Sequence, residues 1–378
     1  MANVSKLIAK IREKTGSTSF AESRYGEVTD FIDTGSYALN RIISGSVFKG
    51  IPSGRITTIA GESETGKSLL AAQLMASALK KGYDYIFYFD SEGGALRDFF
   101  ERVGCDPNKI EQILVSTIEE AETKILSVFN DIEEAKKDCS DEDIKAGNVP
   151  RFLCVLDSLG GLTNEKVKRD ANKGEIKSDM GGSAKLKNQM FKTLTIPALK
   201  SDTALVVINH TYDDPADMYP GKIKNMGGGK GLKYMSRLII QCDRKLEKSE
   251  DKNDDQFYDG VMLKFFTVKN FLARPSQSTE IFLDFKRGFT RKYEGLFDEA
   301  VRSGLIENPK QGYYTVPTWT GDKLWRKSAL ENNEEMWSVI LQPFDQWSQN
   351  FLKYNKFDEQ NQETDDIDEE GAEEIEIQ

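Results

Sequence analysis

The chain of 378 residues is 38% hydrophobic and 30% charged, which is typical of a globular protein with one large domain and appendages, or with two domains. It has no run of eighteen apolar residues, and residues 1–16 lack the apolar block of a secretory signal, so we expect neither a membrane span nor secretion. Four widely spaced cysteines and one histidine argue against a disulfide framework and a zinc site, and we expect a cytoplasmic protein.

The first 30 residues are predicted to form a short basic amphipathic helix and a Ser/Thr/Glu-rich linker. Val4, Leu7, Ile8 and Ile11 would share one face of that helix. A turn and the start of a helix at residues 31–39 are expected to lead into the core.

Predicted strands and helices alternate from residue 55 to residue 209. The strands are apolar and rich in β-branched or aromatic residues, and the helices between them carry apolar residues at helical spacing. This alternation predicts an α/β fold with a mostly parallel sheet flanked by helices. The expected strands are 55–60, 85–89, 113–116, 151–156 and 204–209, and the expected helices are 69–80, 96–103, 119–137 and 186–199.

The character of the chain changes after the last of these strands. Residues 238–241, 260–269 and 279–285 are strand-like without long helices between them, which predicts a β-rich extension of the same sheet. Residues 291–356 carry helices, turns and all four tryptophans, and we expect them to form a small C-terminal α+β lobe. Residues 357–378 hold eleven acidic and no basic residues, which accounts for the whole net charge of −11 and predicts a disordered acidic tail.

A phosphate-binding motif lies between the first strand and the first helix of the alternation. Residues 61–68 read GESETGKS and match G-x-x-x-x-G-K-[ST] at every fixed position. Its glycines let backbone N–H groups approach phosphate oxygens, and the helix start adds the positive end of its dipole. An ordinary Gly/Ser turn is the weaker interpretation, because strand and helix flank the motif as required. The residues expected to bind a nucleoside triphosphate are Gly61, Glu62, Ser63, Glu64, Thr65, Gly66, Lys67 and Ser68.

Polar residues at the ends of three strands complete the predicted site. Lys67 would reach the β- and γ-phosphates, while the Ser68 hydroxyl and the Asp157 carboxylate would hold Mg²⁺. Glu92 would deprotonate a water that attacks the γ-phosphorus, although it could also be a surface residue in a turn. His210 would sense the γ-phosphate; otherwise it is a capping or loop histidine, just as Asp157 could be an ordinary turn residue at the end of a strand.

Two polar, Gly-containing segments, 164–182 and 211–231, leave the carboxyl ends of strands and are expected to be loops. Their cations could contact a polynucleotide backbone, and their Met and Tyr side chains could stack on or wedge between bases. Composition alone leaves solvated surface loops as an equal alternative, but loops this long are usually functional. The candidate residues for these polynucleotide contacts are Lys166, Lys168, Arg169, Lys173, Lys177, Met180, Tyr212, Met218, Tyr219, Lys222, Lys224 and Lys230.

Taken together, these motifs resemble the RecA family of recombinases, and most closely its bacteriophage members. The resemblance runs from about residue 31 to about residue 355. It rests on DTGS at 33–36, IPSGRI at 51–56, the phosphate motif, YFDSE at 88–92, GCDP at 104–107, VLDSL at 155–159, SDMG at 178–181, VINHT at 207–211, MGGG at 226–229 and VKN at 268–270. It implies a RecA-like P-loop ATPase core at residues 31–290, which forms a helical filament on single-stranded DNA and exchanges strands at the expense of ATP.

The resemblance also implies roles for individual residues. Glu92 matches the catalytic glutamate and Asp157 the Walker B aspartate, whereas His210 falls where bacterial members have a glutamine that couples the γ-phosphate to the second DNA loop. Phe99 matches an aromatic residue that stacks on adenine, and Met180 a base wedge in the first DNA loop. The N-terminal helix would pack on a neighbouring subunit.

The sequence departs from the bacterial pattern at one pair of lysines that reach the ATP of the neighbouring subunit. Lys269 matches the first of them, Phe271 replaces the second, and Arg274 is the candidate substitute. The acidic tail resembles tails that restrain duplex binding, because its charges compete with phosphates for the same cations. Deleting residues 357–378 should therefore strengthen binding to double-stranded DNA at matched salt.

The expected partners are single- and double-stranded DNA, further copies of the chain, a recombination mediator and a single-strand DNA-binding protein, and the expected cofactors are ATP and Mg²⁺. A phage-encoded protein of this kind would act in the host cytoplasm, in recombination, repair and recombination-dependent replication. A hexameric helicase or translocase on the same core is the first alternative. A P-loop scaffold whose nucleotide serves assembly is the second.

Overall fold

A nine-stranded sheet forms the centre of the molecule. The computed structural model describes residues 2–23, 25–140, 143, 148–175, 181–212, 224–247, 260–284, 289 and 292–353. Eight strands follow the order β11-β10-β9-β3-β7-β6-β4-β5, and the short β8 (Asn225–Met226) pairs with β7. The bounds of these eight, in chain order, are β3 (Ile56–Gly61), β4 (Tyr85–Asp90), β5 (Ile110–Leu114), β6 (Phe152–Asp157), β7 (Ala204–Tyr212), β9 (Leu238–Glu247), β10 (Gly260–Asn270) and β11 (Ser278–Asp284).

The six strands from β9 to β5 are parallel, whereas β10 and β11 extend the sheet antiparallel. The predicted mostly parallel α/β sheet with a β-rich extension is therefore confirmed. The register aligns Gly61 of β3 with His210 of β7 and Cys242 of β9, and Asp90 of β4 with Asp157 of β6. The carboxyl ends of these six parallel strands thus lie at one edge of the sheet, where α/β proteins place their ligands.

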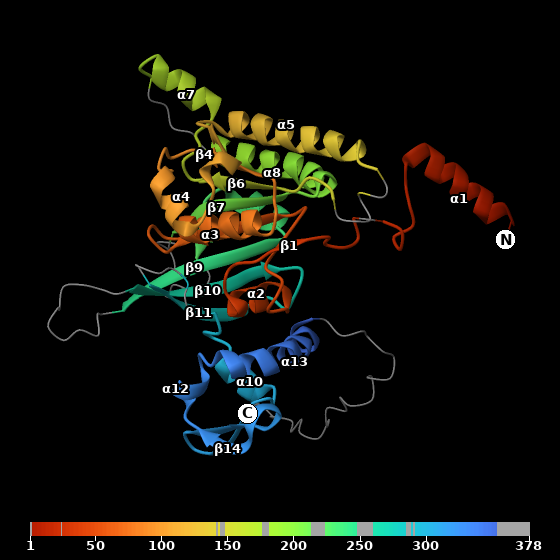
Figure 1. The fold of residues 1–378 in the computed structure, drawn as a ribbon. Helices are drawn as coiled ribbons and strands as arrows, with labels where there is room; N and C mark the ends of the chain where they lie inside the picture. The colour runs from red at the N-terminus through yellow and green to blue at the C-terminus, as the bar shows by residue number, and fades with distance from the viewer. Residues whose placement is uncertain are drawn as a thin grey trace, which may run out of the picture.

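Helices cover both faces of the sheet (Figure 1). On one face α2 (Tyr37–Ser44), α3 (Lys67–Lys80) and α4 (Arg97–Val103) contribute Leu39, Leu70 and Phe100 to a buried core. On the other face α5 (Ile118–Lys137), α8 (Gly182–Ser201) and α9 (Gly229–Met235) contribute Phe129, Phe191 and Leu232 to a second core. Burial on both faces explains why the central strands are continuous apolar runs.

The C-terminal part of the chain packs around a third core that includes Trp337 and Phe344. Asp345, which is 3% exposed, ties this part to the sheet domain by accepting hydrogen bonds from Ser46 Oγ and Val47 N, both at 2.7 Å. The predicted boundary at residue 291 stays a proposal. The elements here are α10 (Phe297–Arg302), β12 (Glu307–Lys310), β13 (Tyr313–Val316), α11 (Pro317–Thr320), β14 (Gly321–Trp325), α12 (Lys327–Leu330) and α13 (Glu334–Leu352).

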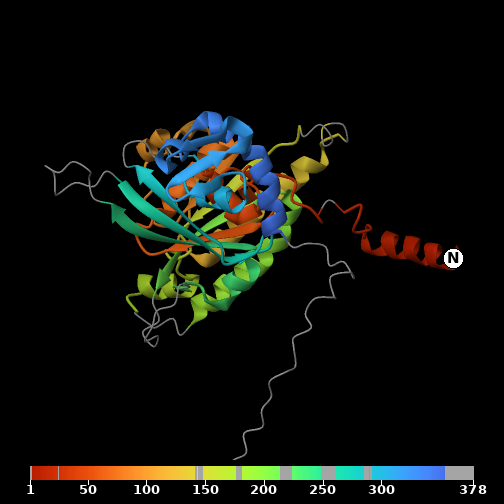
Figure 2. The ribbon, with the colours of Figure 1, turned by 90° about the horizontal axis from the view of Figure 1, so that it is seen from below.

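The N-terminal helix α1 (Ala2–Thr15) stands away from the rest of the molecule in both Figure 1 and Figure 2. Its apolar face is open to solvent, with Val4 63%, Leu7 56%, Ile8 43% and Ile11 41% exposed. Among the described residues, no helix has both the length and the apolar character needed to cross a membrane. The short β1 (Phe31–Ile32) and β2 (Ile51–Pro52) pair next to α2.

Three predictions about local structure were wrong. The strand expected at residues 113–116 is β5 at Ile110–Leu114, after the 3-10 turn η1 (Pro107–Lys109). The segment 164–182, expected to be a loop, contains the helix α7 (Glu165–Asn172), because the Asn164 side chain caps it at Val167 N (2.8 Å) and most of its residues favour helix. The segment 211–231 likewise includes the end of β7, β8 and the start of α9.

Candidate nucleotide and metal site

Two glycines fix the shape of the loop between β3 and α3. Gly66 caps α3 at φ +83°, and a Cβ there would lie 2.8 Å from Leu263 Cδ1. A Cβ on Gly61 would lie 2.4 Å from Thr65 Oγ1. Any side chain at Gly61 would therefore clash with its neighbours, and one at Gly66 would strain a left-handed backbone, which explains the fixed glycines of the motif. The loop ends at the N-terminus of α3, whose free N–H groups and dipole favour an anion.

Lys67 is the first residue of α3 and is only 5% exposed. Its Nζ donates a hydrogen bond to the backbone oxygen of Glu62, which folds the side chain back along the loop. Burial lowers the pKa of Lys67, while Asp157, Glu92 and Glu62 are among the groups that act in the opposite direction. The amine thus lies near acidic groups and at the start of α3, the end of the helix that favours an anion.

Asp157 ends β6 and is 9% exposed. Tyr88 donates its hydroxyl to Asp157 Oδ2 at 2.8 Å. Burial raises the pKa of Asp157, whereas hydrogen bonds from Tyr88 and Ser68 lower it. The Ser68 hydroxyl and the Asp157 carboxylate therefore lie side by side, and such hard oxygen donors fit Mg²⁺, which usually takes few protein ligands besides phosphate and water.

Glu92 lies in a turn whose backbone is held by the Asp90 side chain. Asp90 is 3% exposed, and its Oδ1 accepts the backbone N–H groups of Glu92 (3.0 Å) and Gly93 (2.7 Å). Its other oxygen, Oδ2, accepts a hydrogen bond from Gln112 Nε2 at 2.9 Å. The backbone of the turn is therefore fixed from both β4 and β5.

The Glu92 carboxylate lies between two polar side chains from neighbouring strands. Ser158 Oγ donates to Glu92 Oε1, and His210 Nε2 lies 3.4 Å from the same oxygen. The Glu92 side chain is 46% exposed, so water can reach it. A carboxylate that is oriented by its neighbours and open to water has the geometry of a general base.

Two ion pairs border the other side of the loop. Lys224 Nζ pairs with the Glu62 carboxylate, and Arg244 Nη2 lies 2.8 Å from Glu64 Oε2. Glu64 has φ +59°, so the backbone turns at this residue. Lys224, a candidate DNA-binding residue within the second segment, thus lies beside the phosphate loop.

Three of the predicted nucleotide-binding residues lie away from the phosphate loop of their own chain. Phe99 is half-buried on α4, edge-on to Phe100 at 5.5 Å. Lys269 Nζ donates to the backbone oxygens of Lys233 (3.0 Å) and Tyr234 (2.7 Å) at the end of α9. Arg274 lies over the Phe351 ring at 5.9 Å, against the C-terminal helix.

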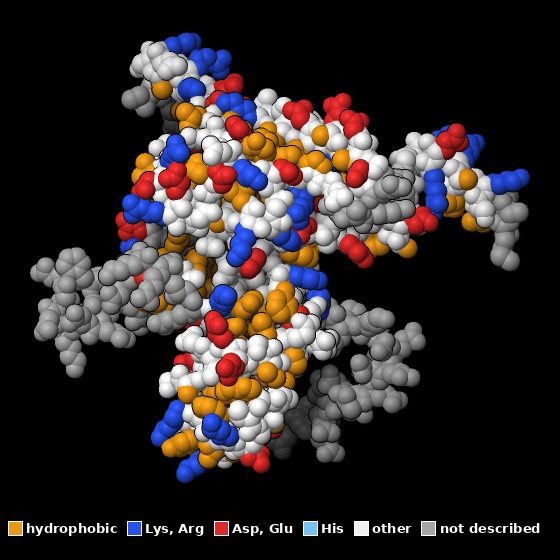
Figure 3. Space-filling model, in the orientation of Figure 1, with side chains coloured by type: hydrophobic (Ala, Val, Ile, Leu, Met, Phe, Trp, Pro, Cys, Tyr) orange, Lys and Arg blue, Asp and Glu red, His pale blue; other side chains and the backbone are white. Residues whose placement is uncertain are grey.

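The basic residues of the first predicted DNA segment gather on and next to α7. Lys166, Lys168, Arg169 and Lys173 are exposed there, and Figure 3 shows Lys and Arg side chains clustered over this helix. Lys168 Nζ also donates to Ser116 Oγ at 2.7 Å. In the second segment, Tyr212 ends β7 and is 54% exposed. Lys177, Met180, Met218, Tyr219 and Lys222 lie outside the described residues, as does the side chain of Lys230, which belongs to α9.

Several side chains of the site were not predicted from the sequence. Tyr88 and Asp90 could have been found, because both belong to a strand that ends next to Glu92, and Ser158 follows Asp157 directly. Gln112 and Arg244 carry no such signal, because only the pairing of β5 with β4 and of β9 with β3 brings them to the site.

Comparison with known proteins gives one family and a consistent set of relatives. The model of the RecA N-terminal domain matches residues 2–290. The chain is 27% identical over 356 residues to the recombination and repair protein of Enterobacteria phage T4, which covers 91% of this chain and 82% of the relative. It is also 25% identical to protein RecA of Borreliella burgdorferi (92% and 91% covered) and 28% identical to protein RecA of Thermus aquaticus (76% and 77% covered). The family model spans well over half of the chain, which therefore belongs to the RecA family.

Proposed function

We propose that the protein is an ATP-dependent DNA recombinase. It forms a helical filament on single-stranded DNA, pairs that strand with a homologous duplex and exchanges strands, while DNA stimulates its ATP hydrolysis. The names of its relatives, a phage recombination and repair protein and two RecA proteins, support this function.

One observation carries the proposal. A phosphate loop, an oxygen pair for a metal, a solvent-exposed carboxylate and a basic helix all lie at or soon after the carboxyl ends of neighbouring parallel strands. Lys67, Ser68, Asp157 and Glu92 supply the chemistry, and α7 follows β6 within eight residues. A bound nucleotide and bound DNA would therefore contact residues at the ends of the same group of strands.

The side chains divide the hydrolysis between them. Glu92 accepts a proton from a water whose oxygen bonds to the γ-phosphorus, while the bond from that phosphorus to the β–γ bridging oxygen breaks and ADP leaves. Lys67 stabilises the negative charge on the phosphoryl oxygens, and His210, close to Glu92, responds to the γ-phosphate. Ser68 and Asp157 would hold Mg²⁺, which supplies charge neutralisation on the phosphates when bound.

The remaining assignments depend on a filament. Phe99 stacks on adenine, and Lys269, with Arg274 as a second cation, serves the nucleotide of the neighbouring subunit. The apolar face of α1 packs on that neighbour, which would remove its exposed side chains from water. The basic residues of segments 164–182 and 211–231 bind DNA, the tail restrains duplex binding, and a mediator and a single-strand DNA-binding protein act with the filament in the cytoplasm.

ATP hydrolysis with and without single-stranded DNA tests the proposal. We expect DNA to stimulate hydrolysis, and we expect Glu92→Gln to lower kcat by about 10²–10³-fold while DNA binding is retained. Glu111→Gln, at an exposed glutamate of β5, is the matched control and should behave like the original protein. Hydrolysis that is indifferent to DNA would contradict the recombinase function and favour an assembly scaffold.

A further inference from the structure

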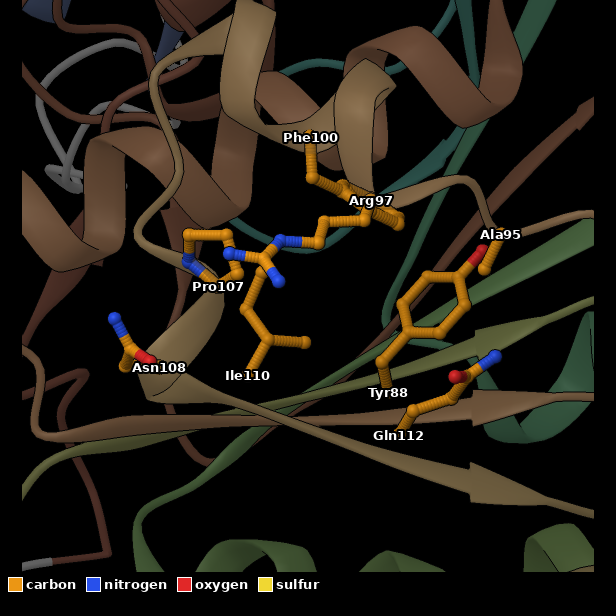
Figure 4. A pocket seen from close by; sticks show the side chains of 8 residues that line it. All are labelled: Tyr88, Ala95, Arg97, Phe100, Pro107, Asn108, Ile110 and Gln112. Carbon is orange, nitrogen blue, oxygen red and sulfur yellow. The ribbon is translucent and has the colours of Figure 1, made fainter.

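A cavity of about 290 Å³ lies between β4, β5, α4 and η1, beside the carboxyl edge of the sheet but apart from the phosphate loop (Figure 4). Tyr88 and Gln112 form one wall, and Arg97, Phe100 and Asn108 lie around them. Both wall residues also hold acidic side chains of the candidate site. Tyr88 and Gln112 thus face the cavity and also form hydrogen bonds, Tyr88 with Asp157 and Gln112 with Asp90.

Tyr88 connects this cavity to the metal-site aspartate. The residue is 5% exposed, and its ring lies edge-on to Phe100, with centroids 5.2 Å apart and planes at 73°. Burial and the nearby carboxylates raise the pKa of the Tyr88 hydroxyl, which keeps it a neutral donor. Its single proton is directed to Asp157 Oδ2 at 2.8 Å, so it fixes one oxygen of that carboxylate and with it the carboxylate plane.

Gln112 connects the cavity to the Glu92 turn. Its amide donates to Asp90 Oδ2, and Asp90 Oδ1 accepts the two N–H groups at the start of that turn. Without the amide, the Asp90 carboxylate could rotate about its side-chain torsion, and both turn hydrogen bonds would weaken together. Gln112 thus acts on Glu92 through Asp90.

We propose that Tyr88 and Gln112 are positioning residues with separate targets. Tyr88 orients Asp157 for Mg²⁺, and Gln112 orients the Glu92 turn for the attacking water. The proposal rests on the proposed function, because it assigns a metal and a base to this site. Substitution of Tyr88 should therefore change the Mg²⁺ dependence of nucleotide binding, whereas substitution of Gln112 should change the rate of hydrolysis.

Tyr88→Phe removes the hydroxyl and keeps the ring contact with Phe100. With a fluorescent ATP analogue, we expect the Mg²⁺ concentration for half-maximal binding to rise about 5- to 10-fold, as for loss of one hydrogen bond to a charged group. Binding of the analogue in EDTA should stay unchanged, because Asp157 acts on the nucleotide through the metal. Tyr85→Phe, at a 42% exposed tyrosine of the same strand, is the matched control.

Gln112→Leu leaves a similar volume beside the cavity and removes the donor to Asp90. We expect kcat to fall about tenfold, while KM and the Mg²⁺ dependence of nucleotide binding stay as in the original protein. An unchanged Mg²⁺ dependence in Tyr88→Phe would overturn the role of Tyr88, and an unchanged kcat in Gln112→Leu would overturn that of Gln112. A loss of Mg²⁺-free binding in one of these variants, with a lower Tm, would show that the substituted residue has only a structural role.

The binding measurements need neither DNA nor hydrolysis. If the original protein binds the analogue with Mg²⁺ but shows no DNA-stimulated hydrolysis, the proposed function fails while the role of Tyr88 can still be confirmed or refuted.

Discussion

The two sides of the phosphate loop hold their acidic side chains in different ways. On the side of β6 and β4, neutral groups donate the hydrogen bonds: Tyr88 to Asp157, Gln112 to Asp90, and Ser158 to Glu92. Asp157 and Asp90 are themselves buried. Neutral, short-range contacts of this kind depend on geometry and hardly on ionic strength.

On the side of β9, cations hold the carboxylates. Lys224 pairs with Glu62 and Arg244 with Glu64, and the Glu64 side chain is 76% exposed. Exposed ion pairs are screened by salt, and their cations can exchange a carboxylate for a phosphate oxygen. We therefore propose that the first side keeps its carboxylates in fixed positions, and that the cations of the second side exchange carboxylates for phosphate oxygens when nucleotide or DNA binds.

The largest effect is expected on the neutral side. Ser158→Ala removes the hydroxyl that donates to Glu92 Oε1, so the base is held less well and kcat for ATP should fall about tenfold. KM for ATP and DNA affinity should not change, because Glu92 contacts neither before the reaction. Steady-state kinetics with Ser127→Ala, an exposed serine of α5, as the control would check this. An equal loss in nucleotide affinity would contradict the expectation that Ser158 acts on Glu92 alone.

A smaller effect is expected from Glu62→Gln on the cationic side. The substitution removes a negative charge next to the bound phosphates and releases Lys224, so the Kd for an ATP analogue should fall about three- to fivefold at 50 mM salt. The gain should shrink at 0.5 M salt because the interaction is screened. Titrations at both salt concentrations measure this, and a gain that is independent of salt would show that charge is not the cause.

The smallest effect is expected from Arg244→Gln. Its partner Glu64 is mostly exposed, and such pairs contribute little, so the Kd for the analogue should rise by less than about threefold. The same titration on Glu64→Gln provides a comparison, because the loss of this negative charge should tighten binding of the analogue slightly. A tenfold loss in Arg244→Gln would instead place its guanidinium in direct contact with nucleotide.

Much of this site could be predicted from the sequence, because its signals are local. The glycines at 61 and 66, the lysine at 67 and the flanking strand and helix all lie within residues 55–80, and Asp157 and Glu92 lie at or just after the ends of apolar strands. Parallel strands bring such ends to one edge, so their proximity follows from the fold class.

The rest depends on pairings between distant segments. Gln112 reaches Asp90 only because β5 pairs with β4, and Lys224 reaches Glu62 only because β8 folds back on β7. The helix α7 was not predicted, because its segment is polar and contains glycine, as loops do. Asn164 before Glu165 is nevertheless a usable helix-start signal.

A homologous pairing assay is the most direct test of the proposed recombinase function. A labelled single strand would be mixed with the protein and a duplex that either shares or lacks its sequence, with ATP and Mg²⁺ present or absent. We expect a joint product only with the homologous duplex and ATP, and none with Lys67→Ala, while Lys80→Ala at the exposed end of α3 should behave like the original protein. No joint product, or one formed equally with an unrelated duplex, would contradict that function.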